Sequence, residues 1–305
     1  LDRFHDTVDL GWLAGDPARE ADLRAGVDLR IATYAGHGER NGHVGPVPPD
    51  TVTVRPVTGP QRTVGPSRLG RFHEDRYQLL VDVRTLREAH DTLPKETLRS
   101  EDLFGALCTF TMTVDLELDG DDLDESCRAC RAALAPVFAC RNGSTSPLLT
   151  VFGHSHLDVA WKWPLAETRR KMERTLSNQF ALLDRYPEYR YFQSQPYLLD
   201  MVKVHFPALY ERFRAEVLAG RIFPEGGMYV ESDTNLPCGE SLVRQFLAGR
   251  RFLREEFGVE SRLCWLPDVF GYSGALPQIL AGCGIEAFTT SKLLWAYNGG
   301  DPFPY

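Results

Sequence analysis

The stretch "LLTVFGHSHLDVAWKW", residues 148–163, decides the fold and the candidate site together. Its first part, residues 148–152, is an apolar run, which predicts a buried strand. His154, His156 and Asp158 follow directly. Side chains two apart in extended backbone point the same way, so His156 and Asp158 can face one cation, with His154 as a third candidate. Imidazole and carboxylate suit a catalytic zinc ion, and a hydrogen-bonded turn without metal is the alternative.

Strand-like and helix-like segments alternate downstream of this stretch. The expected strands are 148–152, 189–194, 222–230, 262–266 and 285–291, and the expected helices are 165–185, 196–219, 240–257 and 274–282. Alternation with short turns predicts an α/β fold with a parallel sheet. Because no G-x-G-x-x-G follows a strand, a dinucleotide-binding fold is disfavoured. We therefore predict a β/α barrel, whose active site would lie at the C-terminal ends of its strands.

Two other segments come before the predicted barrel. Residues 1–71 are rich in glycine, proline and charge with short strand-like runs, and they predict a truncated N-terminal β module. Residues 72–147 predict a helical segment that ends in the linker "RNGSTSP". In that segment Cys127 and Cys130 lie at helical spacing among apolar residues, which predicts a buried helix face rather than a zinc or redox pair. Residues 148–305 would then form the N-terminal part of the barrel.

Composition excludes several classes of function. The 305 residues carry a net charge of −8 and no basic cluster, which argues against a nucleic-acid partner. No apolar run approaches the roughly 20 residues that span a membrane. The seven irregularly spaced cysteines favour a reducing compartment, so we expect a cytoplasmic protein. The sequence leaves the oligomeric state open, a homo-oligomer included.

Acidic residues follow two further predicted strands. Asp268 lies in "CWLPDVFGYSG", residues 264–274, where it could ligate a metal, act as a nucleophile or cap the next helix. Glu231 and Asp233 follow another strand through a Gly-Gly pair. Acidic side chains in loops are usually solvated, so neither of these two residues is distinctive alone.

Aromatic residues gather near the same predicted strand ends. They are Trp161, Trp163, Tyr229, Trp265, Phe270 and Trp295. Aromatic rings with a polar rim suit a carbohydrate pocket, because the rings pack on the C–H faces of sugars. Trp265 and Trp295 fit the barrel core as well, and Trp161, directly after the candidate ligands, is the best candidate for contact with substrate.

Four motifs in order resemble one known family. They are "GHSHLDVAWKWPLAETRRK" (153–171), "EGGMYVESDTNLPCGESLVRQFLAGRRF" (225–252), "WLPDVFGYSGALPQIL" (265–280) and "FTTSKLLW" (288–295). This arrangement is similar to the α-mannosidases of glycoside hydrolase family 38, in the branch that holds cytosolic, vacuolar and many bacterial enzymes. The resemblance implies a seven-stranded β/α barrel as the catalytic domain.

The resemblance also implies a role for each matched residue. His156 and Asp158 would bind zinc, and Asp268 would be both a third ligand and the catalytic nucleophile. The aromatic residues Trp161 and Phe270 would line the sugar pocket, with Lys292 near the nucleophile. The implied reaction is zinc-dependent, retaining hydrolysis of terminal α-linked mannose from oligosaccharides or glycans.

In this family the fourth zinc ligand, a histidine, and the acid/base aspartate would lie beyond Tyr305. We therefore expect an N-terminal fragment that is inactive alone. Two alternatives stay open. "GHSHLD" also reads as the H-x-H motif of metal-dependent amidohydrolases, in which His154 and His156 would both bind metal. The second alternative is a non-catalytic carbohydrate-binding protein on a barrel that has lost its activity. Loss of the nucleophile would indicate this alternative, but Asp268 is present.

Overall fold

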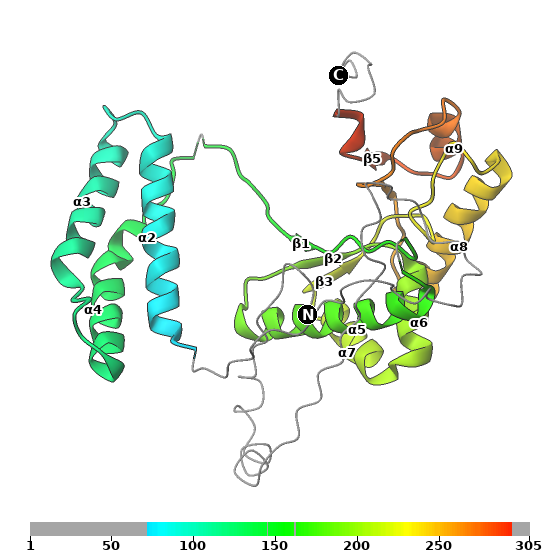
Figure 1. Ribbon diagram of the computed structural model, residues 1–305. Coiled ribbons are helices and arrows are strands. Elements are labelled where there is room, and N and C mark those ends of the chain that lie inside the picture. The colour runs from blue at the N-terminus through cyan, green and yellow to red at the C-terminus, as the bar shows by residue number, and fades with distance from the viewer. Residues whose placement is uncertain (1–71, 145, 162, 295–305) are drawn as a thin grey trace, which may run out of the picture. The chain divides into compact units, whose positions relative to one another are not determined.

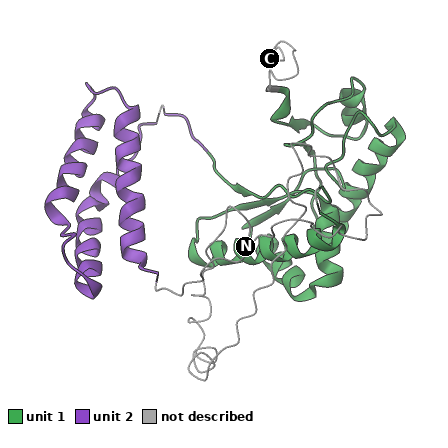
Figure 2. Ribbon diagram, viewed as in Figure 1, with its two compact units in different colours: residues 1–61, 150–305 green, residues 62–149 purple. Residues whose placement is uncertain are grey.

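The computed structural model describes residues 72–144, 146–161 and 163–294. Contacts divide the chain into two compact units, residues 62–149 and residues 1–61 with 150–305 (Figure 2). The predicted β module of residues 1–71 lies outside the described residues, as does Trp295. No helix in the described part of the chain combines the length and the apolar character needed to cross a membrane.

In its described residues the first unit consists of three helices, α2 (Glu74–Thr92), α3 (Leu98–Thr113) and α4 (Gly120–Phe138) (Figure 1). The side chain of Thr97 caps α3 by accepting a hydrogen bond from the backbone N–H of Ser100. The three helices enclose one apolar core, in which Cys127 and Cys130 of α4 are buried as free thiols. The predicted buried helix face is confirmed.

The second unit holds two small parallel sheets. Strands β1 (Gly153–His154), β2 (Tyr191–Gln193) and β3 (Ile222–Pro224) form one sheet in the order β1-β2-β3, and β4 (Leu263–Trp265) pairs with β5 (Ala287–Thr289) in the other. The backbone N–H of Trp265 in β4 donates to the carbonyl of Gly226, which follows β3, so the sheets meet there. Neighbouring strands thus follow chain order. The α/β class is confirmed, but the described residues do not show a closed seven-stranded barrel.

Helices connect the strands as the alternation predicts. They are α5 (Leu165–Arg185), α6 (Pro196–His205), α7 (Pro207–Leu218), α8 (Gly239–Phe257) and α9 (Leu276–Gly282), and the short 3-10 helix η2 (Lys292–Leu294) follows β5. The apolar stripe of α5, from Met172 to Leu183, is buried. Helix α8 ends at Gly258, whose positive φ of 70° a side chain would disfavour.

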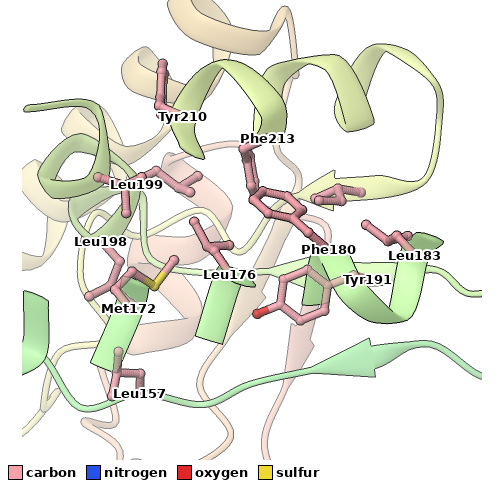
Figure 3. Close-up of a cluster of buried hydrophobic side chains, with 12 residues drawn as sticks. Leu157, Met172, Leu176, Phe180, Leu183, Tyr191, Leu198, Leu199, Tyr210 and Phe213 are labelled. Carbon is pink, nitrogen blue, oxygen red and sulfur yellow. The ribbon is translucent and has the colours of Figure 1, made fainter. Parts of the chain in front are cut away.

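The largest core of this unit lies between the first sheet and its helices. Met172, Leu176 and Phe180 project from α5 toward residues of α6, α7 and β2 (Figure 3). Tyr191 of β2 is fully buried in the same cluster. This packing fixes the position of β2. The residues after Gln193, the last residue of β2, lie in a loop at the C-terminal edge of the sheet.

The predicted strand at residues 148–152 is wrong in position. Leu148 and Leu149 are 93% and 82% exposed, and β1 begins only at Gly153. The backbone pairing explains the difference, because β1 aligns with β2 through Gly153 opposite Tyr191 and His154 opposite Phe192. Pairing with a buried neighbour decides where a short strand forms, and an apolar run by itself does not.

Candidate metal centre and catalytic site

The candidate site lies at the C-terminal ends of strands from both sheets. His156 and Asp158 come just after β1, and Asp268 comes just after β4. In the described part of the chain these three form a group whose ligand atoms all lie within 4.8 Å of one another. Parallel strands place their C-terminal ends on one side, which is how residues more than a hundred positions apart meet here.

The spacing within this group fits a metal ion. His156 Nε2 lies 3.4 Å from Asp158 Oδ1 and 3.5 Å from Asp268 Oδ2. Two atoms bound to one zinc ion at about 2.0–2.2 Å in a tetrahedron lie about 3.3–3.6 Å apart. The donor set of one imidazole and two carboxylates also suits a catalytic site that leaves a position for substrate. These three residues could therefore hold a metal.

The two oxygens of Asp268 have different neighbours. Oδ2 faces His156, whereas Oδ1 forms an ion pair with Nζ of Lys292 in η2. The ammonium of Lys292 also lies 4.6 Å from the centre of the Phe270 ring, and the ring itself is exposed. Asp268, Phe270 and Lys292 thus form one surface beside the metal group, with an aromatic face open to solvent.

Glu231 is the residue whose part in the site the sequence did not reveal. It follows β3 through the Gly226-Gly227 turn, and its side chain is only 4% exposed. Its Oε2 lies 2.9 Å from His156 Nδ1, and its Oε1 accepts a hydrogen bond of 2.5 Å from the Ser194 hydroxyl. The only sequence signal was an acidic residue just after a predicted strand, and that signal fits a solvated loop equally well.

The polar residues after β2 were also missed. Gln193, Ser194 and Gln195 are all buried, although they are polar and follow one another. Gln195 accepts from the backbone N–H of Glu231 and donates to the carbonyl of Leu157. The sequence stretch "FQSQP" had the signal of consecutive polar residues at a strand end, but nothing in it distinguishes buried from exposed ones.

His154 contacts neither of the two candidate metal-binding carboxylates. Its Nε2 lies 3.0 Å from Ser194 Oγ, and its ring stacks edge-on against Trp265 with centroids 5.0 Å apart. Burial, reinforced by the nearby His156, lowers the pKa of His154 to about 4. The described polar contact of the His154 ring is thus with a serine and not with a metal-binding carboxylate. An amidohydrolase site would need both histidines on one ion, and this arrangement does not support that alternative.

The charge on His156 is set by its carboxylate neighbours. Burial acts to lower its pKa, but Asp158 and Glu231 outweigh burial and raise the pKa of His156 to about 10. The ring in this state is a cation among three carboxylates, because Asp268 is the third. The site thus has a strong preference for positive charge at the position between Nε2 and the two oxygens of the metal group.

The remaining candidates lie at the rim or in the core. Trp161 is partly exposed and packs edge-on against Trp163, with centroids 6.0 Å apart. Trp265 lies in an aromatic cluster with Phe152, His154 and Phe192, in keeping with the core role considered for it. Asp233 is exposed and its Oδ1 accepts from the backbone N–H groups of two following residues, so it stabilises a turn.

Comparison with known proteins supplies the family. Residues 147–304, just over half of the chain, match the family model described as glycosyl hydrolases family 38, N-terminal domain. The chain therefore belongs to glycosyl hydrolase family 38.

Two curated proteins, one human and one from yeast, agree with this assignment. Human α-mannosidase 2C1 is 39% identical over 239 residues, which are 78% of this chain and 22% of that protein. The α-mannosidase of Saccharomyces cerevisiae is 42% identical over 166 residues, 53% of this chain and 15% of that protein. A crystal structure of an α-mannosidase from Enterococcus faecalis V583 aligns with a TM-score of 0.42 and 28% identity, over 46% of this chain and 16% of its own. The chain spans between 15% and 22% of the length of four curated relatives, the human and yeast proteins among them.

Proposed function

We propose that this chain carries the zinc-binding and nucleophilic half of the active site of an α-mannosidase. The observation that carries the proposal is the group of His156, Asp158 and Asp268, with ligand atoms within 4.8 Å, in a chain that belongs to glycosyl hydrolase family 38. The proposed substrate is terminal α-linked mannose in an oligosaccharide or glycan. The named mannosidases among the relatives support the choice of sugar.

We assign the roles of the site residues from their contacts. His156, Asp158 and Asp268 Oδ2 would bind zinc, and Asp268 Oδ1, which points to Lys292 instead, would be the nucleophilic oxygen. The exposed ring of Phe270 and the indole of Trp161 would contact the sugar. His156, Asp158 and Asp268 would hold a zinc ion beside the sugar, where it would supply a Lewis acid for hydroxyl oxygens and would contribute to the selection of mannose.

The proposed reaction proceeds in two displacements with retained configuration. Asp268 Oδ1 attacks the anomeric carbon, and the bond to the leaving oxygen breaks as a second carboxyl group gives that oxygen a proton. Water then attacks the same carbon, loses its proton to the second carboxyl group, and releases the Asp268 carboxylate. The second group lies outside the four motifs of this chain.

The architecture proposed for residues 148–305 is part of a seven-stranded β/α barrel, with residues 72–147 as a separate helical segment and residues 1–71 as a truncated β module. The sequential strand order supports a barrel, since an open doubly wound sheet changes direction at its centre. The division of the chain near residue 150 supports the boundary. Seven free cysteines, all of them described, support the proposed cytoplasmic location.

Substitution of Asp268 tests the function in the full-length protein. Asp268→Ala removes the nucleophile and one metal ligand, so turnover of an aryl α-mannoside should fall by about three or more orders of magnitude and zinc content should drop. Asp268→Asn keeps a ligating oxygen but cannot form the ester, so it should hold more zinc than the alanine variant and stay almost inactive. Zinc content is measured by atomic absorption after dialysis.

The matched control is Asp233→Asn, which makes the same chemical change in a neighbouring loop. Its amide oxygen can still accept the two backbone hydrogen bonds of the turn, so activity and zinc content should stay near wild type.

A fluorinated mannosyl reagent should label Asp268 in peptide mass analysis. A label on Glu231 or Asp233 would refute the nucleophile, and full activity in Asp268→Ala would refute the site.

A further inference from the structure

We propose that Glu231 is a positioning residue for the metal ligand His156, and that Ser194 and His154 hold Glu231 in place for this task. The inference rests on the proposed zinc site and adds to it the residues that orient its histidine. Glu231 contacts neither the position between the three ligands nor the nucleophile in any described interaction. It would act through the imidazole alone.

The two nitrogens of the His156 ring have different neighbours. Nδ1 lies 2.9 Å from Glu231 Oε2, whereas Nε2 faces the metal-group oxygens of Asp158 and Asp268 at 3.4 and 3.5 Å. A histidine that binds metal is neutral and has one N–H and one lone pair. When the proton is on Nδ1, the nitrogen nearest Glu231, the lone pair of Nε2 is left on the side of the two carboxylates, where the ion is needed.

The protons around Glu231 have a fixed order. A carboxylate can only accept, so the Ser194 hydroxyl donates its proton to Glu231 Oε1. Ser194 Oγ must then accept from His154 Nε2, 3.0 Å away, which fixes the N–H of His154 on that nitrogen. Each hydrogen in the series His154, Ser194, Glu231 has one position. The series therefore directs the negative charge of Glu231 toward His156.

Hydrogen bonds of Gln195 connect Glu231 to the loop that carries His156. Its backbone N–H donates to Gln195 Oε1 at 3.3 Å, and the side chain of Gln195 also donates to Leu157, next to His156, at 2.8 Å. Gln195 has φ 60°, a left-handed conformation that is uncommon outside glycine. The loops after β1, β2 and β3 are thus joined at one point, behind the imidazole.

The buried charge of the Glu231 carboxylate needs a partner that compensates it. A carboxylate that is nearly inaccessible to water costs free energy unless charge and hydrogen bonds compensate it. Arginine or lysine compensates other buried glutamates of this unit, such as Glu167 with Arg170 and Arg174. The described contacts of the Glu231 carboxylate are with a serine and with His156. Its compensation comes from the site itself.

Zinc affinity of the full-length protein tests the proposal without reference to activity. Glu231→Gln keeps the size of the side chain but removes its charge and disturbs the order of protons. Competition with a chromophoric chelator should show zinc affinity about 10–100-fold weaker than wild type, the usual effect of removing the partner of a metal-bound histidine. In cobalt-substituted protein the visible absorption bands should shift, because the imidazole is a poorer ligand.

Glu167→Gln is the matched control, since Glu167 is a glutamate of the same unit with a side chain only 2% exposed. Its zinc affinity and cobalt spectrum should equal those of wild type. Ser194→Ala is the second variant, chosen because it leaves the Glu231 charge in place. It removes the link between Glu231 and His154, and zinc affinity should weaken severalfold, by less than in Glu231→Gln.

Several outcomes would overturn the inference. Unchanged zinc affinity in Glu231→Gln would overturn the positioning role of Glu231. The proposed function would still stand if wild type binds zinc and hydrolyses the aryl mannoside. An equal loss in Glu167→Gln would mean that any buried charge change loosens the unit, and the specific role fails. If Glu231→Gln does not fold, wild-type affinity in Ser194→Ala rejects the proposal. Failure of wild type to bind zinc removes both this inference and the proposed function.

Discussion

Asp268 and Lys292 form the ion pair on which the proposed chemistry depends. Oδ1 of the carboxylate contacts the ammonium, while Oδ2 lies 3.5 Å from His156 Nε2. The side chain of Lys292 is mostly buried, and the Phe270 ring lies beside its charge. In the proposed second displacement Asp268 would be the leaving group, and its oxygen would regain negative charge. A cation at that oxygen stabilises this charge as it develops.

Lys292→Met should therefore slow the breakdown of the glycosyl-enzyme more than its formation. With an aryl α-mannoside that has a good leaving group, we expect a rapid burst of phenol and then a steady-state kcat lower by about 10²-fold. Stopped-flow absorbance of the full-length protein measures both phases. Lys292→Arg is the control, because it keeps the positive charge and should lose less. A steady-state rate equal to wild type in the methionine variant would contradict this role.

At the scale of elements, hydrogen bonds and close packing connect the loops that carry the site. The Thr234 hydroxyl, after β3, donates to the carbonyl of Gly271 and accepts from the backbone N–H of Ser273, after β4. Helix α8 supports the same region from behind. A Cβ at Gly249 of α8 would lie 2.3 Å from the carbonyl oxygen of Gly227, in the turn that leads to Glu231.

Gly249→Ala should destabilise the second unit and displace the loop that carries Glu231. The methyl group would meet backbone atoms, which cannot move aside as a flexible side chain does, so we expect a loss of about 1–3 kcal/mol. Calorimetry of the full-length protein should show that unit unfolding at a lower temperature.

Gly105→Ala in α3 provides the opposite case. Outside the backbone of its own helix no atom lies within 4 Å of a Cβ there, so the change should stabilise the helical unit by about 0.5–1 kcal/mol, because alanine favours the helix. For the Gly249→Ala variant, in contrast, an unchanged or higher unfolding temperature would contradict the packing of α8 on the turn at Gly227.

At the scale of the whole molecule, burial divides the cysteines into reactive and protected thiols. Cys238 is exposed before α8, and the hydroxyl and backbone N–H of Ser241 lower the pKa of its thiol. Burial raises the pKa of Cys127 and of Cys130, in the core of the helical unit. The thiolate is the reactive form, so both access and charge favour Cys238.

Iodoacetamide at neutral pH should modify Cys238 first, Cys140 next, and Cys127 and Cys130 last. Peptide mass analysis at successive times measures the order in native full-length protein. In denaturant the differences should disappear, because every thiol is then exposed with an ordinary pKa. Rapid labelling of Cys127 or Cys130 in the native protein would show that the core of the helical unit is open to solvent.

The sequence by itself determined the local elements and the order of the site motifs. Apolar residues at helical spacing predicted the buried face of α4, and the expected helices at 165–185 and 240–257 correspond to α5 and α8. The spacing of His156 and Asp158 predicted that they face one cation, the family resemblance added Asp268, and the ligand atoms of all three do lie together. These inferences succeeded because periodicity and strand ends are properties of neighbouring residues. The catalytic and metal-binding roles stay predictions.

Only the tertiary structure decided which distant residues serve the site and where β1 begins. An exposed run at 148–152 and a strand at 153–154 result from pairing with β2, which the run itself does not encode. Glu231 looked like an ordinary loop residue, yet the meeting of loops after β1, β2 and β3 buries it against His156. Burial and partner choice depend on segments far apart in the chain. For that reason the orientation of the histidine could be read only from the folded protein.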